Sequence, residues 1–320
     1  MNIKNISKSV LLLITVASLG VLVACSLITS EKSTAADASI TAEYNTSRLV
    51  SVEWLNDHLN DGNIKIIDVR KLKDGVPVSY NEGHIPGAIN IPANTTFQIA
   101  TDEVKGMLPS ADHIAKVLSE AGVKPTDTII FYDDIKSLWA SRALWGMDVY
   151  GHADSRILNG DIKLWIEKGY ALSTETPEIK TTNYSFTGKP NPNLIVTWEE
   201  VVASIKDGSA KVCDTRSPDE YSGKDVRADR GGHIPGSVNV NWVANSAEDR
   251  TFLPKADLQK IYSNANLVSG DKIYTLCQTA VRATHTWFVL SELLGYSNAA
   301  VYDGSWTEWG NRTDTPIDVK

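Results

Sequence analysis

The chain has 320 residues, 42% of them hydrophobic and 22% charged, which is typical of a globular protein long enough for two ordinary domains. Its formal net charge is −8, and residues 1–24 carry Lys4 and Lys8 without any acidic residue, so the rest of the chain stands at −10 (−8 minus 2). Such an acidic chain does not suit nucleic acid or an anionic lipid surface, and we expect neither as a partner.

The amino-terminal segment has the features of a bacterial export signal. Lys4 and Lys8 precede an almost wholly apolar run at 10–23, which is too short and wrongly flanked for a typical membrane-spanning helix. Residues 22–25, Leu-Val-Ala-Cys, resemble the lipobox of bacterial lipoproteins, in which the cysteine is lipidated and becomes the first mature residue.

The lipobox predicts an exported protein that a lipid on Cys25 anchors to a bacterial membrane, on its periplasmic or cell-surface side. Residues 1–24 are then a signal peptide. Residues 25–48, rich in Ser, Thr, Ala and Glu, are expected to form a flexible tether. An ordinary secretory signal with a chance cysteine is the alternative interpretation.

Beyond the tether, motifs recur at an offset of 144 to 149 residues, which indicates a duplicated domain. Asp-x-Arg at 68–70 recurs at 214–216, and Gly-His-Ile-Pro-Gly at 83–87 recurs at 232–236. Further pairs are Trp54 and Trp198, the strand-like runs 128–132 and 272–276, Gly160 and Gly304, and Trp165 and Trp309. Each copy alternates short apolar strands with helical segments, which predicts an α/β fold with a parallel sheet covered by helices.

The repeat also sets the domain boundaries. We place domain 1 at 49–170 and domain 2 at 193–316. Between them, residues 171–192 hold three prolines and many Thr, Ser and Asn residues, a composition typical of a linker.

The stretch that begins at residue 272 carries the strongest chemical signal. The run 272–276 predicts a buried strand, and the run 283–294, closed by Gly295, predicts a helix with its stop signal. Cys277 therefore lies on a tight loop, where loop amides and the helix amino terminus favour thiolate over thiol. Arg282 adds a full positive charge nearby. We interpret Cys277 as a nucleophile rather than as a buried structural cysteine.

The other cysteines offer no competing chemistry. Cys213 lies in a strand-like run and is expected to be a small buried hydrophobic residue. A disulfide between Cys213 and Cys277 would suit an oxidising compartment, but it would abolish the nucleophile. The sequence contains no CxxC, HExxH or Cys/His cluster, so we expect no metal and no cofactor.

The repeated Asp-x-Arg and Gly-His-Ile-Pro-Gly motifs, the cysteine loop and the segment 302–309 (Tyr-Asp-Gly-Ser-Trp-x-Glu-Trp) resemble tandem-domain rhodanese-type sulfurtransferases, over nearly everything after residue 48. The resemblance implies two rhodanese-like domains, each a central parallel sheet flanked by helices, with an active cysteine in the second only. It also implies that this cysteine becomes a persulfide and passes sulfur to a thiophilic acceptor, such as cyanide or a thiol. Asp133 stands at the position of Cys277 in the first copy, so domain 1 is expected to be inactive.

The candidate site residues follow from this resemblance. Cys277 attacks the outer sulfur of a small donor, and the amides that stabilise the anionic persulfide are those of Gln278, Thr279, Ala280, Val281 and Arg282. Arg282 is expected to hold the anionic end of the donor or else to pair with an acid. Arg216 stands where the family places an anion-binding arginine, with a structural ion pair to Asp214 or Glu220 as the alternative. Asp214 is expected to order the loop backbone.

The loop departs from the family pattern in ways that leave the donor open. Ala280 stands where many relatives carry Gly, and a positive φ there would cost about 1 kcal/mol. Gln278-Thr279 is neutral, unlike the Arg-Lys of thiosulfate-specific relatives or the Gly-Ser of mercaptopyruvate-specific ones. Glu220 lies near the place of a second arginine in mercaptopyruvate relatives. We therefore expect a thiosulfate-like anion as donor, with 3-mercaptopyruvate as the alternative.

Two other functional classes compete with this interpretation. Phosphatases of related fold carry Cys-x5-Arg, whereas Cys277 to Arg282 is Cys-x4-Arg, and the shorter cradle suits a single sulfur better. A non-catalytic persulfide carrier or redox-sensing module is a further alternative that the residues leave open. We expect a monomeric enzyme, a thiosulfate-type sulfurtransferase acting on small molecules.

Overall fold

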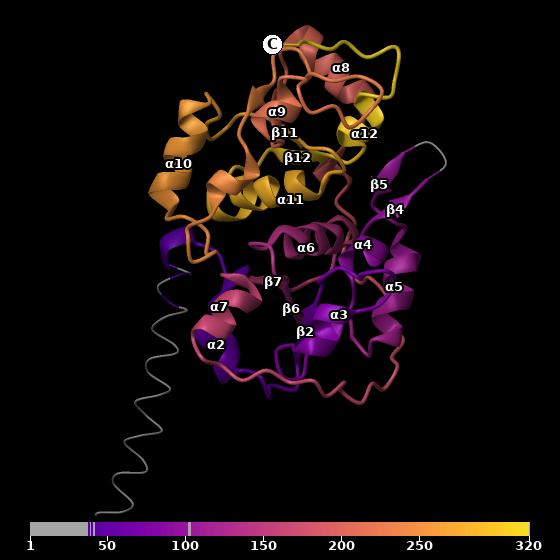
Figure 1. The fold of residues 1–320 in the computed structure, drawn as a ribbon, viewed down its shortest axis with the longest axis vertical. Helices are drawn as coiled ribbons and strands as arrows, with labels where there is room; N and C mark the ends of the chain where they lie inside the picture. Colours follow the sequence, from indigo (N-terminus) through magenta and orange to yellow (C-terminus); the bar gives the residue numbers. More distant parts are fainter. Residues whose placement is uncertain (1–37, 39, 41, 102–103, 320) are drawn as a thin grey trace, which may run out of the picture.

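The computed structural model describes residues 38, 40, 42–101 and 104–319 and shows two domains, one above the other in Figure 1. The predicted signal peptide and the predicted lipidation site Cys25 lie outside these residues. Among the helices of the described residues, none is long and apolar enough to cross a membrane.

Domain 1 is built on a five-stranded parallel sheet in the order β1-β7-β6-β2-β3. Its strands are β1 (Leu49–Val50), β2 (Ile64–Asp68), β3 (Ile89–Asn90), β6 (Thr128–Tyr132) and β7 (Ser155–Leu158). Every residue of the central strand β6 is buried, as expected for a parallel sheet covered on both faces. The covering helices are α2 (Val52–Asp57), α3 (Val78–Glu82), α4 (Ala93–Thr96), α5 (Ala111–Glu120), α6 (Leu138–Tyr150) and α7 (Asp161–Glu167).

Domain 2 repeats this arrangement with the sheet order β10-β9-β11-β12-β8, again all parallel. Its strands are β8 (Ile195–Val196), β9 (Lys211–Asp214), β10 (Val238–Asn239), β11 (Ile273–Leu276) and β12 (Ala299–Tyr302). The helical segments are η1 (Pro192–Leu194), α8 (Trp198–Asp207), α9 (Pro218–Tyr221), η2 (Trp242–Asn245), α10 (Lys255–Asn264), α11 (Val281–Phe288), η3 (Val289–Leu293) and α12 (Ser305–Trp309). The predicted fold class, two α/β domains with central parallel sheets, is confirmed.

The two domains meet through equivalent helices. Figure 1 shows α6 and α11 lying against each other between the sheets, and the two helices are in contact along their lengths. Domain 1 also sends out an antiparallel hairpin, β4 (Ile99–Ala100) and β5 (Lys105–Met107), which reaches α12 of domain 2. A short helical turn before β1 places the Tyr44 side chain, 4% exposed, against domain 2, where its hydroxyl donates to the Leu253 carbonyl oxygen at 2.8 Å.

Tyr44 corrects one expectation from the sequence. The tether predicted for residues 25–48 does not extend to residue 48, because Glu43 and Tyr44 already bind domain 2, with the Lys255 N–H donating to Glu43 at 3.0 Å. The segment is largely polar in composition, and its one aromatic residue, Tyr44, binds it to domain 2. The linker at 171–192 is also bound to domain 1. Its Ser173 pairs with His84 through two backbone hydrogen bonds.

Candidate active site

Cys277 lies directly after β11, at the carboxyl edge of the sheet, and is 1% exposed. It is a free cysteine, as is the buried Cys213 on the neighbouring strand β9. Three loop residues follow before α11 begins at Val281, and the last of them, Ala280, has a φ of 60°. Alanine takes this left-handed conformation at a cost of roughly 1 kcal/mol, so other contacts must hold the loop in place.

The main such contact is Ser305, which the sequence analysis did not single out. Its Oγ accepts the Cys277 N–H at 3.2 Å and the Ala280 N–H at 3.1 Å, and donates to the Tyr302 carbonyl oxygen at 2.9 Å. The repeat could have revealed it, because Ser305 corresponds to Asp161, which accepts the Lys136 N–H at 2.9 Å in the loop of domain 1. Both copies therefore use the first residue of their last helix to shape this loop.

The Ala280 N–H is used within the protein, in the bond to Ser305, whereas the neighbouring backbone N–H groups are available to a ligand. Among the described residues, no acceptor receives the backbone N–H groups of Thr279, Val281 or Arg282. Free N–H groups at a helix amino terminus form a site for an anion. The loop is therefore equipped to bind negative charge beside Cys277.

Domain 1 shows what its own version of this loop binds. The Asp133 carboxylate, fully buried, accepts four backbone N–H bonds, from Ile135 at 2.8 Å, Ser137 at 3.1 Å, Trp139 at 2.6 Å and Ala140 at 3.0 Å. Burial raises the pKa of Asp133 to about 7, while these donors oppose the shift. The loop of domain 1 is occupied by a side chain of the chain itself, and it carries no nucleophilic sulfur.

Arg282 is paired rather than free. Its two terminal nitrogens bind both oxygens of Glu220 at 2.6 and 2.8 Å, and its side chain is 16% exposed. Burial acts to lower the pKa of Arg282, but its hydrogen bonds to Glu220 and the nearby Cys277 sulfur outweigh it and raise the pKa. Burial alone would raise the pKa of Glu220, but the pairing with Arg282 lowers it to about 2. Of the two roles expected for Arg282, the structure shows the pairing with an acid, beside Cys277.

Arg216 is buried and paired at the end of β9. It is 1% exposed, its guanidinium binds Asp214 at 2.6 Å and the Gly232 carbonyl oxygen at 2.8 Å, and it stacks on Trp306 at 4.1 Å. Asp214 also accepts the Arg216 backbone N–H at 3.0 Å, which orders the end of β9. Domain 1, which has no reactive cysteine, repeats the pair as Arg70 and Asp68. Of the two roles expected for Arg216, the structure shows the ion pair with Asp214, and the donor-binding role stays a prediction.

The remaining predicted residues are in the loop with Cys277, but their side chains are directed elsewhere. Gln278 donates its side-chain N–H to the Arg227 carbonyl oxygen at 2.9 Å, and its buried Oε1 has no donor among the described residues. Thr279 offers its carbonyl oxygen to Gln98 of domain 1 at 3.0 Å. Val281 is buried at the start of α11. The loop therefore presents backbone amides rather than side chains to a bound anion.

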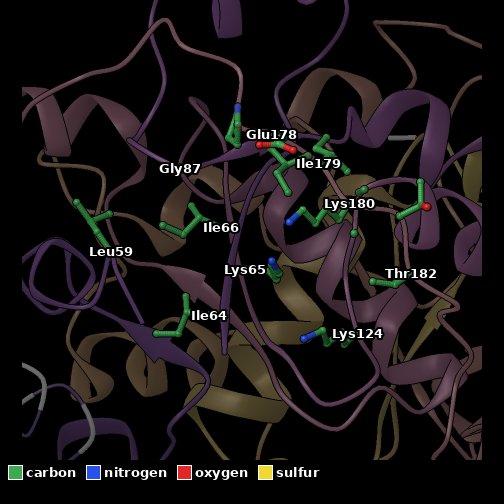
Figure 2. Close-up of a pocket in the computed structure, with 15 residues that line it drawn as sticks. Leu59, Ile64, Lys65, Ile66, Gly87, Lys124, Glu178, Ile179, Lys180 and Thr182 are labelled. Atoms are coloured by element: carbon green, nitrogen blue, oxygen red, sulfur yellow. The ribbon is translucent and has the colours of Figure 1, made fainter. Parts of the chain in front are cut away.

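A pocket of about 590 Å³ lies elsewhere, between β2, the end of α5 and the linker (Figure 2). It is lined by Lys65, Lys124 and Lys180 together with Glu178 and apolar side chains, and none of its lining residues belongs to the cysteine loop. It holds no cysteine, and no cluster of three potential metal ligands occurs within the described residues.

The fold and site define a class: a tandem α/β protein in which one copy of a strand–loop–helix unit carries a buried cysteine among anion-binding amides. The family model described as "Rhodanese-like domain" matches residues 51–168 and 197–312. This chain belongs to the rhodanese family, with two rhodanese-like domains in tandem.

Similar proteins cover nearly the whole length of the chain. A putative thiosulfate sulfurtransferase of Mycolicibacterium smegmatis is 36% identical over 85% of this chain and 97% of its own length. A thiosulfate sulfurtransferase of Corynebacterium glutamicum is 33% identical over 85% and 90%. The sulfur carrier protein TtuD of Thermus thermophilus is 34% identical over 84% and 95%.

A solved structure shares the fold. The anaerobic ergothioneine biosynthesis enzyme from Chlorobium limicola, in complex with trimethyl histidine, superposes with a TM-score of 0.76. The match is 22% identical and covers 85% of this chain and 70% of that one. At this identity the likeness concerns the fold alone.

Proposed function

We propose that the protein is a sulfurtransferase that moves a sulfane sulfur from a thiosulfate-like anion to a thiophilic acceptor through a persulfide on Cys277. The observation that carries this proposal is the contrast between the two loops. In a cysteine persulfide the outer sulfur stands as many bonds from the backbone as the carboxylate oxygens of aspartate. Four amides bind the oxygens of Asp133, and the free amides of the Cys277 loop would bind an anionic outer sulfur in the same way.

The proposed steps balance as two displacements at sulfur. The Cys277 thiolate, its proton released to solvent, attacks the outer sulfur of thiosulfate. The S–S bond of the donor breaks and sulfite leaves with the bonding pair. Cyanide or a thiolate then attacks the outer sulfur of the persulfide, leaves with it, and returns Cys277 to the thiolate.

The proposal is tested by weighing the protein intact after incubation with thiosulfate, for the wild type and for Cys277→Ser. We expect one added sulfur on the wild type, removed by cyanide, and none on the variant. Equal uptake by both proteins would contradict the assignment of Cys277. Cys213 is the internal control, because burial raises the pKa of its thiol and keeps it protonated.

Two alternatives differ in donor and in turnover. 3-Mercaptopyruvate carries a carboxylate and thiosulfate is a dianion, so the Glu220 carboxylate beside Arg282 opposes both donors and does not separate them. A persulfide carrier would load sulfur without rapid release to cyanide. The similarity to the sulfur carrier protein TtuD supports testing this alternative. Steady-state rates with both donors, and the decay of the loaded protein with and without cyanide, separate the three.

We further propose that the protein is exported and anchored by a lipid on Cys25, as its lipobox-like residues 22–25 suggest. One lipid together with an acidic globular body gives a membrane-anchored protein. In the native host, the wild type should fractionate with membranes, and Cys25→Ser should be released as soluble protein or accumulate unprocessed. A Cys25→Ser variant that stays membrane-bound and normally processed would refute the anchor.

A further inference from the structure

The peptide bond between Thr279 and Ala280 is held on both of its polar atoms. From domain 1, Gln98 donates its side-chain N–H to the Thr279 carbonyl oxygen at 3.0 Å. From domain 2, Ser305 Oγ accepts the Ala280 N–H at 3.1 Å. Each domain therefore fixes one side of the same peptide plane, two residues after Cys277.

This peptide needs restraint, because Ala280 adopts a φ of 60° that disfavours any residue with a Cβ atom. If the plane flipped, Ala280 would leave the left-handed region and both hydrogen bonds would be lost. The path of the chain into α11 would change with it. The free N–H groups of Val281 and Arg282 would then no longer share the direction that makes them an anion site.

The β4–β5 hairpin places Gln98 against the loop. Gly106, on β5, has a φ of 96°, and a Cβ atom built on it would lie 2.8 Å from Gln98 Nε2 and 2.8 Å from Thr279 Cβ. Glycine is therefore required where the hairpin backbone meets both partners of the hydrogen bond. In Figure 1 the hairpin extends from domain 1 along the side of α12, which is the direction this contact requires.

A buried ion pair holds the hairpin and the Ser305 segment together. Arg142 of α6 binds Asp303 at 2.6 Å, with side chains 0% and 3% exposed, and also donates to the Gly106 carbonyl oxygen at 3.1 Å. Asp303 accepts the Leu108 N–H at 2.7 Å, just beyond the hairpin. Because Asp303 precedes Ser305 by two residues, Arg142 braces both groups that hold the Thr279–Ala280 peptide.

We propose that Gln98 is a positioning residue through which domain 1, although it lacks a nucleophile, keeps the cysteine loop of domain 2 in the shape that binds anionic sulfur. Gln98 acts through the loop backbone, so its loss should slow sulfur uptake and weaken binding of the anionic donor, because the same amides face both. The kinetic consequence rests on the proposed function, whereas the effect on the loop backbone does not.

The test compares the full chain with Gln98→Ala, Gln98→Glu and a control, Thr101→Ala. Thr101 closes the same hairpin through hydrogen bonds to Val104, and within the described residues its side chain makes no hydrogen bond to domain 2. Hydrogen exchange of the loop amides reports on the backbone, and intact mass after mixing with thiosulfate reports on sulfur uptake. Thermal unfolding of each variant shows whether it is folded.

For Gln98→Ala we expect loop exchange about tenfold faster and sulfur uptake about tenfold slower, the effect of losing one hydrogen bond, with a raised KM for thiosulfate. Gln98→Glu should lose more, because its carboxylate faces the Thr279 carbonyl oxygen. Thr101→Ala should match the wild type in both measurements. Wild-type exchange in Gln98→Ala overturns the positioning role whatever the activity, and so does faster exchange with unchanged sulfur uptake. A wild type that takes up no sulfur refutes the proposed function, and the exchange comparison still decides the effect on the loop.

Discussion

Arg282 interacts with two groups, the Glu220 carboxylate and the Cys277 sulfur. It binds Glu220 with both terminal nitrogens, and its charge also acts on the Cys277 sulfur. Glu220 is in turn fixed by the start of α9, where it forms a capping box with Ser217. An arginine held this firmly keeps its charge near Cys277 but has fewer donors to offer a substrate anion.

Glu220→Gln should separate these two effects. The guanidinium loses its counter-charge, so we expect the free energy of unfolding at pH 7 to fall by about 2 kcal/mol, the typical strength of a charged hydrogen bond. The KM for thiosulfate should fall as well, because Arg282 becomes free to bind the dianion. Urea denaturation and steady-state kinetics measure the two quantities.

The pKa of Glu220 fixes how the stability difference between wild type and Glu220→Gln changes with pH. The pKa of Glu220, about 2 in the folded protein, lies below its ordinary value of 4.5, so the carboxylate stabilises the fold above pH 4.5 and loses this effect as the pH falls toward 2. The stability gap between wild type and Glu220→Gln should narrow over that range. Asp225→Asn, which breaks an exposed pair with Arg227, is the control and should change little. A constant gap from pH 6 to pH 3 would contradict the prediction.

At the scale of elements, the working unit is strand, loop and helix. In domain 1, five residues separate the end of β6 at Tyr132 from the start of α6 at Leu138. In domain 2, four residues separate Leu276 from Val281. The offset between the copies stays at 144 residues from Asp133 and Cys277 to Asp161 and Ser305, so the two loops have the same length and α11 simply begins one residue earlier than α6. The loop of domain 1 surrounds a carboxylate, whereas that of domain 2 leaves its amides free, so the residue that follows the strand accounts for the difference.

Ser305→Ala tests how the loop of domain 2 keeps its shape. The change leaves two buried N–H groups, those of Cys277 and Ala280, without an acceptor, so we expect a loss of about 2 kcal/mol in unfolding free energy and slower sulfur uptake. Ser305→Asp retains an acceptor, as Asp161 does in domain 1, and should regain part of the stability. It should stay slow, because its charge repels an anionic persulfide. Denaturant unfolding and intact-mass kinetics check both expectations, and full activity in Ser305→Ala would refute them.

The sequence analysis predicted the elements well and their mutual contacts poorly. Repeated motifs and apolar runs are local signals, and they were enough to predict the parallel sheets and the loop position of Cys277. The hydrogen bond from Gln98 to Thr279 joins residues 181 positions apart, and no local pattern encodes it. Arg216 shows the same limit, since only the folded chain reveals that Asp214 and Trp306 enclose its guanidinium.

At the scale of the whole molecule, His285 makes the stability of the domain interface dependent on pH. It is fully buried on α11 between Phe252 and Trp242, and its Nε2 bonds to the Lys136 carbonyl oxygen of domain 1 at 3.1 Å. Burial lowers the pKa of His285 to about 3. Its neutral form therefore supports the fold above its ordinary pKa of about 6.5, and this support is lost as the pH falls toward 3.

His285→Phe should remove this acid sensitivity. At pH 7.5 the variant loses the hydrogen bond to Lys136 and should be less stable by about 1 kcal/mol. As the pH falls from 6.5, the wild type should lose its advantage and become the less stable protein. Urea denaturation at several pH values measures the crossing, with His113→Gln, an exposed site on α5, as control. Parallel stability curves for wild type and variant would show that His285 does not titrate in this range.

The contact between α6 and α11 has a consequence for how such a protein arises. These helices are equivalent parts of the two copies, so their packing is the self-complementary contact that a symmetric dimer of single domains would make. Joining the copies in one chain keeps the partners together at any dilution. It also lets the halves change independently, which identical subunits cannot do. In a fused chain one half can fill its loop with Asp133 and specialise as a scaffold, while the other keeps Cys277.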